Sequence, residues 1–243
     1  MGLSALAFGG SARLHASVSQ RARFPALREL YSGALGRFVP NPSLRPERLL
    51  GLEAGATLLR TGVQLQSVLF HHRMRDAIVR ADAGGGQLRR ENRDQIRSTG
   101  LELLGGWSSP ALSMTADLLL QHVRVIDVAA ASERHPENQP AFRVGADATA
   151  PIAWGVTGII GAEYVGAQYC LHPDLGREIS IAGKGRANAA VEREWRLRGN
   201  AAGGLLRTLR TTLSLDNVAD AAIYDQCGLP QPGRTLRFGF VLR

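Results

Sequence analysis

The feature that most constrains this sequence is a repeated alternation of apolar and polar residues with a period of two. Residues 141–152 show it most clearly, because every second side chain from Phe142 to Ile152 is apolar while Arg143 and Asp147 lie between them. This period places successive side chains on opposite faces of a β-strand, and helical periodicity is hard to find anywhere in the chain. We therefore expect an all-β, antiparallel fold of about ten strands. They are expected at residues 11–19, 49–59, 63–72, 95–107, 111–124, 141–152, 154–169, 185–197, 205–216 and 234–243.

The connections between these strands alternate between short and long. The short ones hold "RTG" at 60–62, "SSP" at 108–110, a reversal at 151–154 and "RGNAAGG" at 198–204. Tight turns at one rim and long loops at the other are typical of up-and-down transmembrane β-barrels of the outer membrane. A soluble sandwich has no reason to keep such an alternation, and lipocalin-type barrels have short connections at both rims. The long connections are residues 21–48, 76–94, 126–140, 170–184 and 217–233.

The three tryptophans, Trp107, Trp154 and Trp195, all fall at the short-turn ends of their strands and on the apolar face. Tryptophan favours the membrane–water interface, so we interpret the three as an aromatic girdle. Tyr164 lies ten residues from Trp154 on the same face, which is ~33 Å along a strand and ~25 Å in height after a tilt of ~40°. That height matches an apolar band across a bilayer. The alternative is three tryptophans buried in a soluble core.

The composition excludes several other classes of protein. The 243-residue chain has no run of apolar residues long enough for a membrane-spanning helix. The net charge is +8, and almost all of the positive charge comes from arginines scattered along the chain, with Lys184 as the only lysine. We therefore expect no nucleic-acid partner. We expect no catalytic, cofactor or metal site either. The pair His71–His72 is better explained as a hydrated loop pair than as a metal site, and "GGG" at 84–86 precedes no helix that would make it a phosphate loop.

The two cysteines, Cys170 and Cys227, are too few for a disulfide framework and lack the spacing of metal ligands. Both fall on the long-loop side of the expected topology. Export through an oxidising compartment would allow them to form a disulfide between two outer loops, and two free thiols are the alternative.

The polar face of the expected strands carries many charges. In a small soluble barrel such charges would be buried, which costs several kcal/mol each unless they are paired, whereas in a wide barrel they line a wet lumen. The pattern therefore favours a large enclosure. The charged residues are Glu53, Glu102, Asp117, Arg143, Asp147, Glu163, Arg210 and Arg237.

Residues 18–53 contain three short motifs that give the sequence a family resemblance. An arginine–aromatic–proline stretch is followed by "RELY" at 28–31 and then by "NPSLRPE" at 41–47, and "LDNVADAAIYDQ" at 215–226 agrees further along. In this order and spacing the chain resembles the TonB-dependent outer-membrane receptors over nearly its whole length. The matching residues are Arg23, Phe24, Pro25, Glu29, Asn41, Pro42, Leu44, Pro46, Glu47, Asn217, Asp220 and Tyr224.

The resemblance implies that residues 1–243 are the C-terminal part of a barrel of about 22 strands, without the plug domain and the TonB box. It implies a receptor in the outer membrane of a Gram-negative bacterium, in contact with membrane lipid, and no enzyme activity. Its partner would be a scarce nutrient complex, most often a ferric siderophore, and TonB would act only through the missing N-terminal region. Haem is less favoured, because no histidine lies between Arg23 and Asn41. Pro42 and Pro46 would hold an outer loop extended where it re-enters the wall.

Two alternatives remain open at this point. One is a complete ten-stranded outer-membrane barrel with a porin-like or hydrolase role, which would recruit Asp127, His122 and His135. The other is a soluble β-rich binding protein, which would stay in solution as a monomer without detergent.

Overall fold

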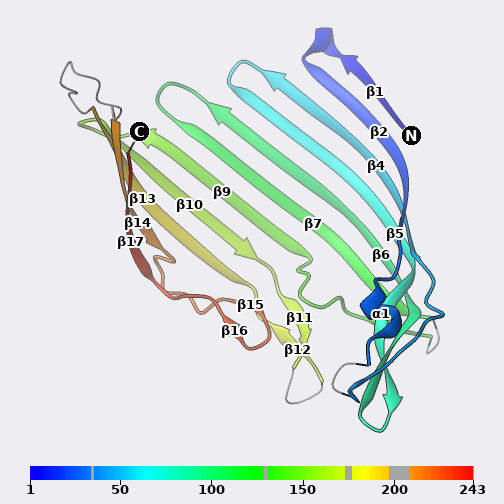
Figure 1. Cartoon of the computed structure of the whole chain (residues 1–243). Coiled ribbons are helices and arrows are strands. Elements are labelled where there is room, and N and C mark those ends of the chain that lie inside the picture. The colour runs from blue at the N-terminus through cyan, green and yellow to red at the C-terminus, as the bar shows by residue number, and fades with distance from the viewer. Residues whose placement is uncertain (34–35, 129–130, 173–176, 197–207, 243) are drawn as a thin grey trace, which may run out of the picture. The chain divides into compact units, whose positions relative to one another are not determined.

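The computed structural model describes residues 1–33, 36–128, 131–172, 177–196 and 208–242, and most of them form long antiparallel strands (Figure 1). The short connection expected at 198–204 lies outside these residues. The described part of the chain contains a 3-10 turn, η1 (Phe8–Gly10), and the five-residue helix α1 (Leu27–Tyr31). No helix among the described residues is both long and apolar enough to cross a membrane.

The main sheet contains all ten expected strands, in sequence order. The prediction of an all-β antiparallel fold is therefore confirmed. β1 is an additional strand at the edge of this sheet, which the sequence did not reveal. The strands of the main sheet are hydrogen bonded in the order β1 (Gly2–Ala7), β2 (Ala12–Arg23), β4 (Glu47–Arg60), β5 (Val63–Gly84), β6 (Gln87–Ser108), β7 (Ser113–Asp127), β9 (Phe142–Pro151), β10 (Val156–Val165), β13 (Lys184–Arg196), β14 (Thr208–Asp216) and β17 (Thr235–Leu242).

Short strands occupy the connections that were expected to be long loops. They are β3 (Phe38–Val39) beside β6, β8 (Ser132–Arg134) beside β7, and two separate hairpins, β11 (Gln168–Leu171) with β12 (Glu178–Ile181) and β15 (Tyr224–Gln226) with β16 (Leu229–Pro230). We call this end of the strands the loop end and the opposite end the turn end.

The prediction of a long loop at residues 76–94 was wrong. β5 and β6 continue as paired strands through most of this range and reverse only at the three glycines 84–86, all of which have a positive φ. Glycine adopts this left-handed conformation without the steric cost that a Cβ would add. The "GGG" motif is therefore the tip of a β-hairpin.

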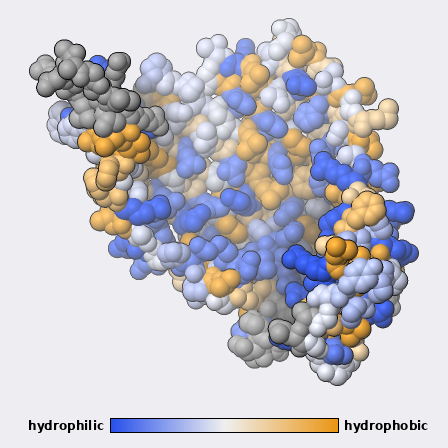
Figure 2. All heavy atoms as spheres, in the orientation of Figure 1, coloured by the Kyte–Doolittle hydropathy of each residue, from blue (hydrophilic) through white to orange (hydrophobic). Residues whose placement is uncertain are grey.

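The chain divides into two compact units, and each is described by itself. The first contains residues 1–56, 67–101 and 121–136, and the second contains 57–66, 102–120 and 137–243. In the first unit, α1 lies at the loop end of its strands (Figure 1). Figure 2 shows hydrophilic residues gathered around this end.

In the second unit the strand register separates an apolar face from a polar face. Ile160 pairs with Ala148 and Ala189 on its two neighbouring strands, and Leu213 pairs with Phe238. Directly paired residues share a face of a sheet, so these side chains form one apolar surface. Ile160 is 63% exposed and Phe238 is 68% exposed. We call this the outward face and the opposite face the inward face.

A water-soluble protein would bury large side chains such as these, since burying one is worth ~1.5–3 kcal/mol. Here the buried apolar residues among those described are few and mostly small: Ala12, Leu44, Phe70, Ala77, Ala81 and Cys170. The sheet therefore has the amphipathic surface of a wall with apolar surroundings on one side, which the soluble alternative does not explain.

Candidate functional site

The proline segment, residues 41–47, is fixed at the loop end of the first unit by its buried Glu47, which is only 8% exposed. One carboxylate oxygen of Glu47 accepts a hydrogen bond from the backbone N–H of Ile78, at 2.7 Å, and the other accepts a short one from the guanidinium of Arg23. Arg23 also donates to Glu29, at 2.9 Å. A single guanidinium thus joins the acid that ends the proline segment to the acid of α1.

This arrangement shifts the ionisation of its members. The hydrogen bond to Glu47, followed by that to Glu29, raises the pKa of Arg23. Burial alone would raise the pKa of Glu29, but the backbone N–H of Ala26, at 2.8 Å, and Arg23 outweigh it and lower that pKa. Glu29 is therefore held as a carboxylate at the first turn of α1, where negative charge is favourable.

Asn41 and Asn92 connect the proline segment to neighbouring strands. The buried Asn41 donates from Nδ2 to the carbonyl of Arg90, at 2.8 Å, and its backbone N–H donates to the carbonyl of Leu30. Asn92 accepts from the backbone N–H of Arg45 at 2.7 Å and donates to its carbonyl at 2.8 Å. Pro42 and Pro46 lack an N–H, so the side chains of β6 replace the pairing that the segment cannot make itself.

The remaining motif residues of this region differ in exposure. Leu44 is buried, whereas Phe24, next to Pro25, is exposed at the surface. The arrangement of Glu47 fits the structural role expected for the proline segment, since its acid is already hydrogen bonded within the fold.

A second acidic group at the loop end was not expected from the sequence. Asp94, 2% exposed, pairs with Arg134 of β8, and Arg93 pairs with Asp127 at 2.8 Å. Burial raises the pKa of Asp94 despite the opposing charge of Arg134. Partners 40 and 34 residues apart leave no local pattern in the sequence, so only the fold reveals these pairs.

Of the three residues that an outer-membrane hydrolase would have recruited, Asp127 forms an ion pair, and His122 and His135 both lie within electrostatic reach of Glu133. Asp127 is engaged by Arg93, and no cluster of His, Cys, Asp and Glu among the described residues could hold a metal ion. His71 and His72 point to opposite faces of β5: Nδ1 of His71 meets the hydroxyl of Thr99 at 2.7 Å, and Nε2 of His72 meets Glu53 at 3.2 Å. Adjacent strand residues cannot chelate one ion from opposite faces.

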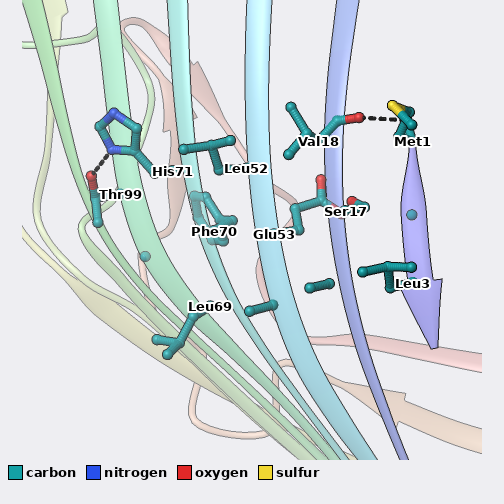
Figure 3. Close-up of a pocket in the computed structure, with 14 residues that line it drawn as sticks. Met1, Leu3, Ser17, Val18, Leu52, Glu53, Leu69, Phe70, His71 and Thr99 are labelled. Carbon is teal, nitrogen blue, oxygen red and sulfur yellow. Dashed lines mark hydrogen bonds between the residues drawn. The ribbon is translucent and has the colours of Figure 1, made fainter. Parts of the chain in front are cut away.

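A hollow of about 720 Å³ on the first unit is bounded by β1, β2, β4, β5 and β6, and Figure 3 shows the side chains that line it. Leu52, Leu69 and Val18 contribute its apolar surface, and the His71–Thr99 hydrogen bond closes one side. The amino group of Met1 donates to the carbonyl of Val18 at 2.8 Å. With so little polar surface, the hollow suits hydrocarbon better than a polar ligand.

The motif residues near the C-terminus organise the loop end of the second unit. Asn217, 4% exposed and with a φ of 49°, exchanges hydrogen bonds with the backbone of Ala221, both at 2.9 Å. Asp220 accepts from the backbone N–H of Arg234 at 2.8 Å. Asparagine and aspartate tolerate this conformation and bond their own backbone, so both residues shape the loop before β15, which begins at Tyr224.

A disulfide between Cys170 and Cys227, with Cα atoms 6.0 Å apart, joins the β11–β12 hairpin to the loop that carries β15 and β16. The buried Gln168 adds hydrogen bonds from Nε2 to the carbonyls of Tyr224 and Asp225, at 3.3 and 3.0 Å. Two hairpins far apart in sequence are thereby held together at the loop end.

Beside this junction lies a pocket of about 360 Å³, which we call the loop pocket. Its floor is formed on the inward face by Glu163, which binds Arg143 at 2.9 Å and Arg186 at 2.8 Å. Lys184 and Tyr224 also line it. Three cations and the two acids Glu163 and Asp225 leave it with a net positive charge, so it favours an anionic ligand.

Further along the inward face of the second unit, charged side chains continue in pairs. Arg210 lies 3.4 Å from Glu192, and Arg237 lies 2.6 Å from Asp216. Gly145 faces Asp117 directly, and a Cβ on that glycine would lie 2.5 Å from the carboxylate. The inward face is therefore a hydrated, charged surface with space made for its acids.

The three tryptophans lie at the turn end of the second unit. Trp107 and Trp195 are the penultimate residues of β6 and β13, and Trp154, 87% exposed, occupies the β9–β10 turn. The ring of Trp195 lies under the guanidinium of Arg193, at 3.9 Å, and its N–H donates to the hydroxyl of Thr211 at 3.0 Å. All three side chains are exposed at the turn end of their strands, as an interfacial aromatic girdle requires. The girdle itself stays a prediction.

Comparisons with known proteins complete this description. The family model described as "TonB dependent receptor-like, beta-barrel" matches residues 5–218. No curated protein matches the sequence. Among solved structures, the FrpB iron transporter from Neisseria meningitidis (F3-3 variant) superposes with a TM-score of 0.75 at 17% identity, over 98% of this chain and 38% of that one.

Two other solved structures are similar to the same extent. The copper transporter OprC gives a TM-score of 0.74 at 16% identity, over 98% of this chain and 38% of that one. The pyoverdine outer membrane receptor FpvA from Pseudomonas aeruginosa PAO1, bound to pyoverdine, gives 0.70 at 12% identity, over 94% of this chain and 33% of that one. The chain thus spans between 33% and 38% of the length of each of the three.

Proposed function

Because the chain belongs to the TonB-dependent receptor family, matching its β-barrel, we propose that it forms part of the wall of an outer-membrane receptor that imports a scarce nutrient complex. A ferric siderophore is the proposed cargo. The family is one of receptors in the outer membrane of Gram-negative bacteria and not one of enzymes, which contradicts the hydrolase alternative.

The observation that carries the proposal is the contrast between the two faces of the second unit. Outward side chains such as Ile160 and Phe238 are large, apolar and exposed, as contact with lipid requires. Inward side chains such as Arg143, Glu163 and Arg186 form ion pairs, as a hydrated lumen permits. A passage for a polar nutrient complex needs this combination.

The loop pocket supplies a site at which the cargo could contact this part of the wall. It lies at the loop end, it is positively charged, and the disulfide and Gln168 fix its border. A preorganised border lowers the entropic cost of binding. Among the solved structures with this fold are the FrpB iron transporter and the pyoverdine receptor FpvA, which supports iron uptake as the first activity to test.

We propose that TonB supplies the energy through regions of the receptor outside these residues. The direct experiment deletes the gene that encodes this chain in its own bacterium and measures uptake of a panel of 55Fe-labelled siderophores during iron limitation. The proposal expects at least one ferric complex to lose uptake, with recovery on complementation and the same loss in a tonB deletion. Unchanged uptake of the whole panel, or uptake that continues without TonB, would contradict it.

A further inference from the structure

On β5 and β6, we call the face that carries Leu69 and Trp107 the outward face, and this face changes from apolar to basic toward the loop end. At the turn end the backbone N–H of Ser108 donates to the carbonyl of Gly62 at 2.8 Å, and the same register places His71 opposite Thr99, to which it is hydrogen bonded (Figure 3). Two residues toward the turn end, Leu69 therefore faces Leu101, and two residues toward the loop end, Arg73 faces Arg97. Arg75 follows on the same face of β5, since side chains repeat every second residue.

The height of these arginines can be worked out along β6. Arg97 lies ten residues from Trp107 on the same face. Ten residues cover ~33 Å of strand, and a tilt of ~40° reduces this to ~25 Å, the height of the apolar band of an outer-membrane barrel. If Trp107 lies at one interface, Arg73 and Arg97 lie at the other, which is the level of the lipid headgroups at the loop end.

The positive charge of this group is not neutralised within the part of the chain that the structure describes. Arg73 lies within electrostatic reach of Arg75 and Arg97, and none of the three forms an ion pair among the described residues. The Nε of Arg73 is buried and lacks a hydrogen-bond partner there, and Arg97 binds only the neutral amide of Gln95, at 2.9 Å. By contrast, Arg124, also of the first unit, is paired with Glu133.

We propose that Arg73, Arg75 and Arg97, which we call the arginine row, bind the phosphate groups of an anionic lipid in the leaflet at the loop end. Guanidinium groups match phosphate in geometry and charge, and the apolar surface around Leu69 would lie beside the acyl chains of the same lipid. The inference rests on the proposed placement in the outer membrane. It adds a lipid site on the outside of the wall, separate from the loop pocket on the inward face.

The test uses the full chain, extracted from outer membranes in mild detergent, and measures binding of fluorescent diphosphoryl lipid A, monophosphoryl lipid A and phosphatidylcholine. We expect affinity to fall in that order. Arg73→Gln/Arg97→Gln should weaken binding of the diphosphoryl lipid at least tenfold, while the affinity for phosphatidylcholine stays unchanged. Raising the salt from 0.15 to 1 M should weaken the wild type far more than this variant, because salt screens exposed charges.

The control variant is Arg60→Gln/Arg196→Gln, which removes the same charge from exposed positions near the turn end. Equal weakening by the control, or equal affinity of the wild type for all three lipids, would overturn the inference. Membrane fractionation of the same strains separates the two proposals. A chain that is absent from the outer membrane contradicts the proposed function, whereas a chain that is present there without lipid selectivity contradicts only the arginine row.

Discussion

Removing the carboxylate of Glu47 is the sharpest test of the interpretation that the proline segment is a structural part of the wall. In Glu47→Ala, the part-buried backbone N–H of Ile78 loses the buried carboxylate that accepts its hydrogen bond, and Arg23 keeps only Glu29. A buried donor without a partner costs ~1–3 kcal/mol. The guanidinium of Arg23 is half exposed, so solvent reduces the lost ion pair to ~1 kcal/mol.

We therefore expect Glu47→Ala to lower the free energy of unfolding by ~2–4 kcal/mol. Glu47→Gln keeps an acceptor for Ile78 and should lose ~1 kcal/mol. The matched control is Glu133→Ala, because Glu133 also pairs with an arginine but both partners are exposed at about half their surface, and no measurable change is expected there.

The assay is urea unfolding of the full chain in detergent micelles, followed by tryptophan fluorescence, together with the rate of proteolysis between residues 24 and 46. Glu47→Ala should unfold at lower urea and be cleaved faster than either Glu47→Gln or the control. If Glu47→Ala unfolds and is cleaved like Glu133→Ala, the network around Glu47 does not stabilise the segment and the reasoning is refuted.

Three further predictions test other parts of the account. Cys170→Ser/Cys227→Ser should make the β11–β12 and β15–β16 region more sensitive to protease, since a cross-link over 57 residues is worth about 4 kcal/mol in the loop-closure model; equal cleavage of wild type and variant would contradict this. Lys184→Gln should weaken binding of ferric citrate to the loop pocket three- to tenfold in a titration, while Arg196→Gln on the same strand should not; equal effects would remove the pocket as the site. The lowered pKa of Glu29 stabilises the fold at pH values above the ordinary value of 4.5, and this contribution should disappear as the pH falls through the pKa of Glu29 in the folded state. The free energy of unfolding of Glu29→Gln should therefore lack this part of the dependence on pH. Identical acid-unfolding profiles of wild type and variant would show that Glu29 contributes nothing.

The strands inside the expected membrane band could be predicted because lipid on one side and water on the other impose a local pattern. Residues 141–152 and 235–243 carry that pattern within a single segment, and β9 and β17 lie where it places them. Residues 87–94 carry charges on both faces, so no apolar face marks this part of the expected loop at 76–94 as a strand, although β5 and β6 continue there. β1 was missed because Leu6 interrupts the alternation of its six residues.

The site could be predicted only in part, since its contacts join distant segments. The sequence identified Arg23, Glu29 and Glu47 through the family resemblance but did not indicate that one guanidinium joins the two acids. Asn92 and Asp94 gave no signal at all, because their partners lie tens of residues away. The five-residue helix α1 is too short to show a helical period, and it is held in place by hydrogen bonds from Arg90 to the carbonyl of Arg28 and from the backbone N–H of Asn41 to the carbonyl of Leu30.

The central claim is that one face of the sheet meets lipid and the other meets water, and β17 allows the most direct test. Single cysteines at residues 236 to 240, in a background in which Cys170 and Cys227 are serine, would carry a nitroxide label in outer-membrane vesicles. The account predicts high oxygen accessibility at 236, 238 and 240 and high accessibility to a water-soluble nickel chelate at 237 and 239. The same accessibility at all five positions, with no period of two, would contradict it.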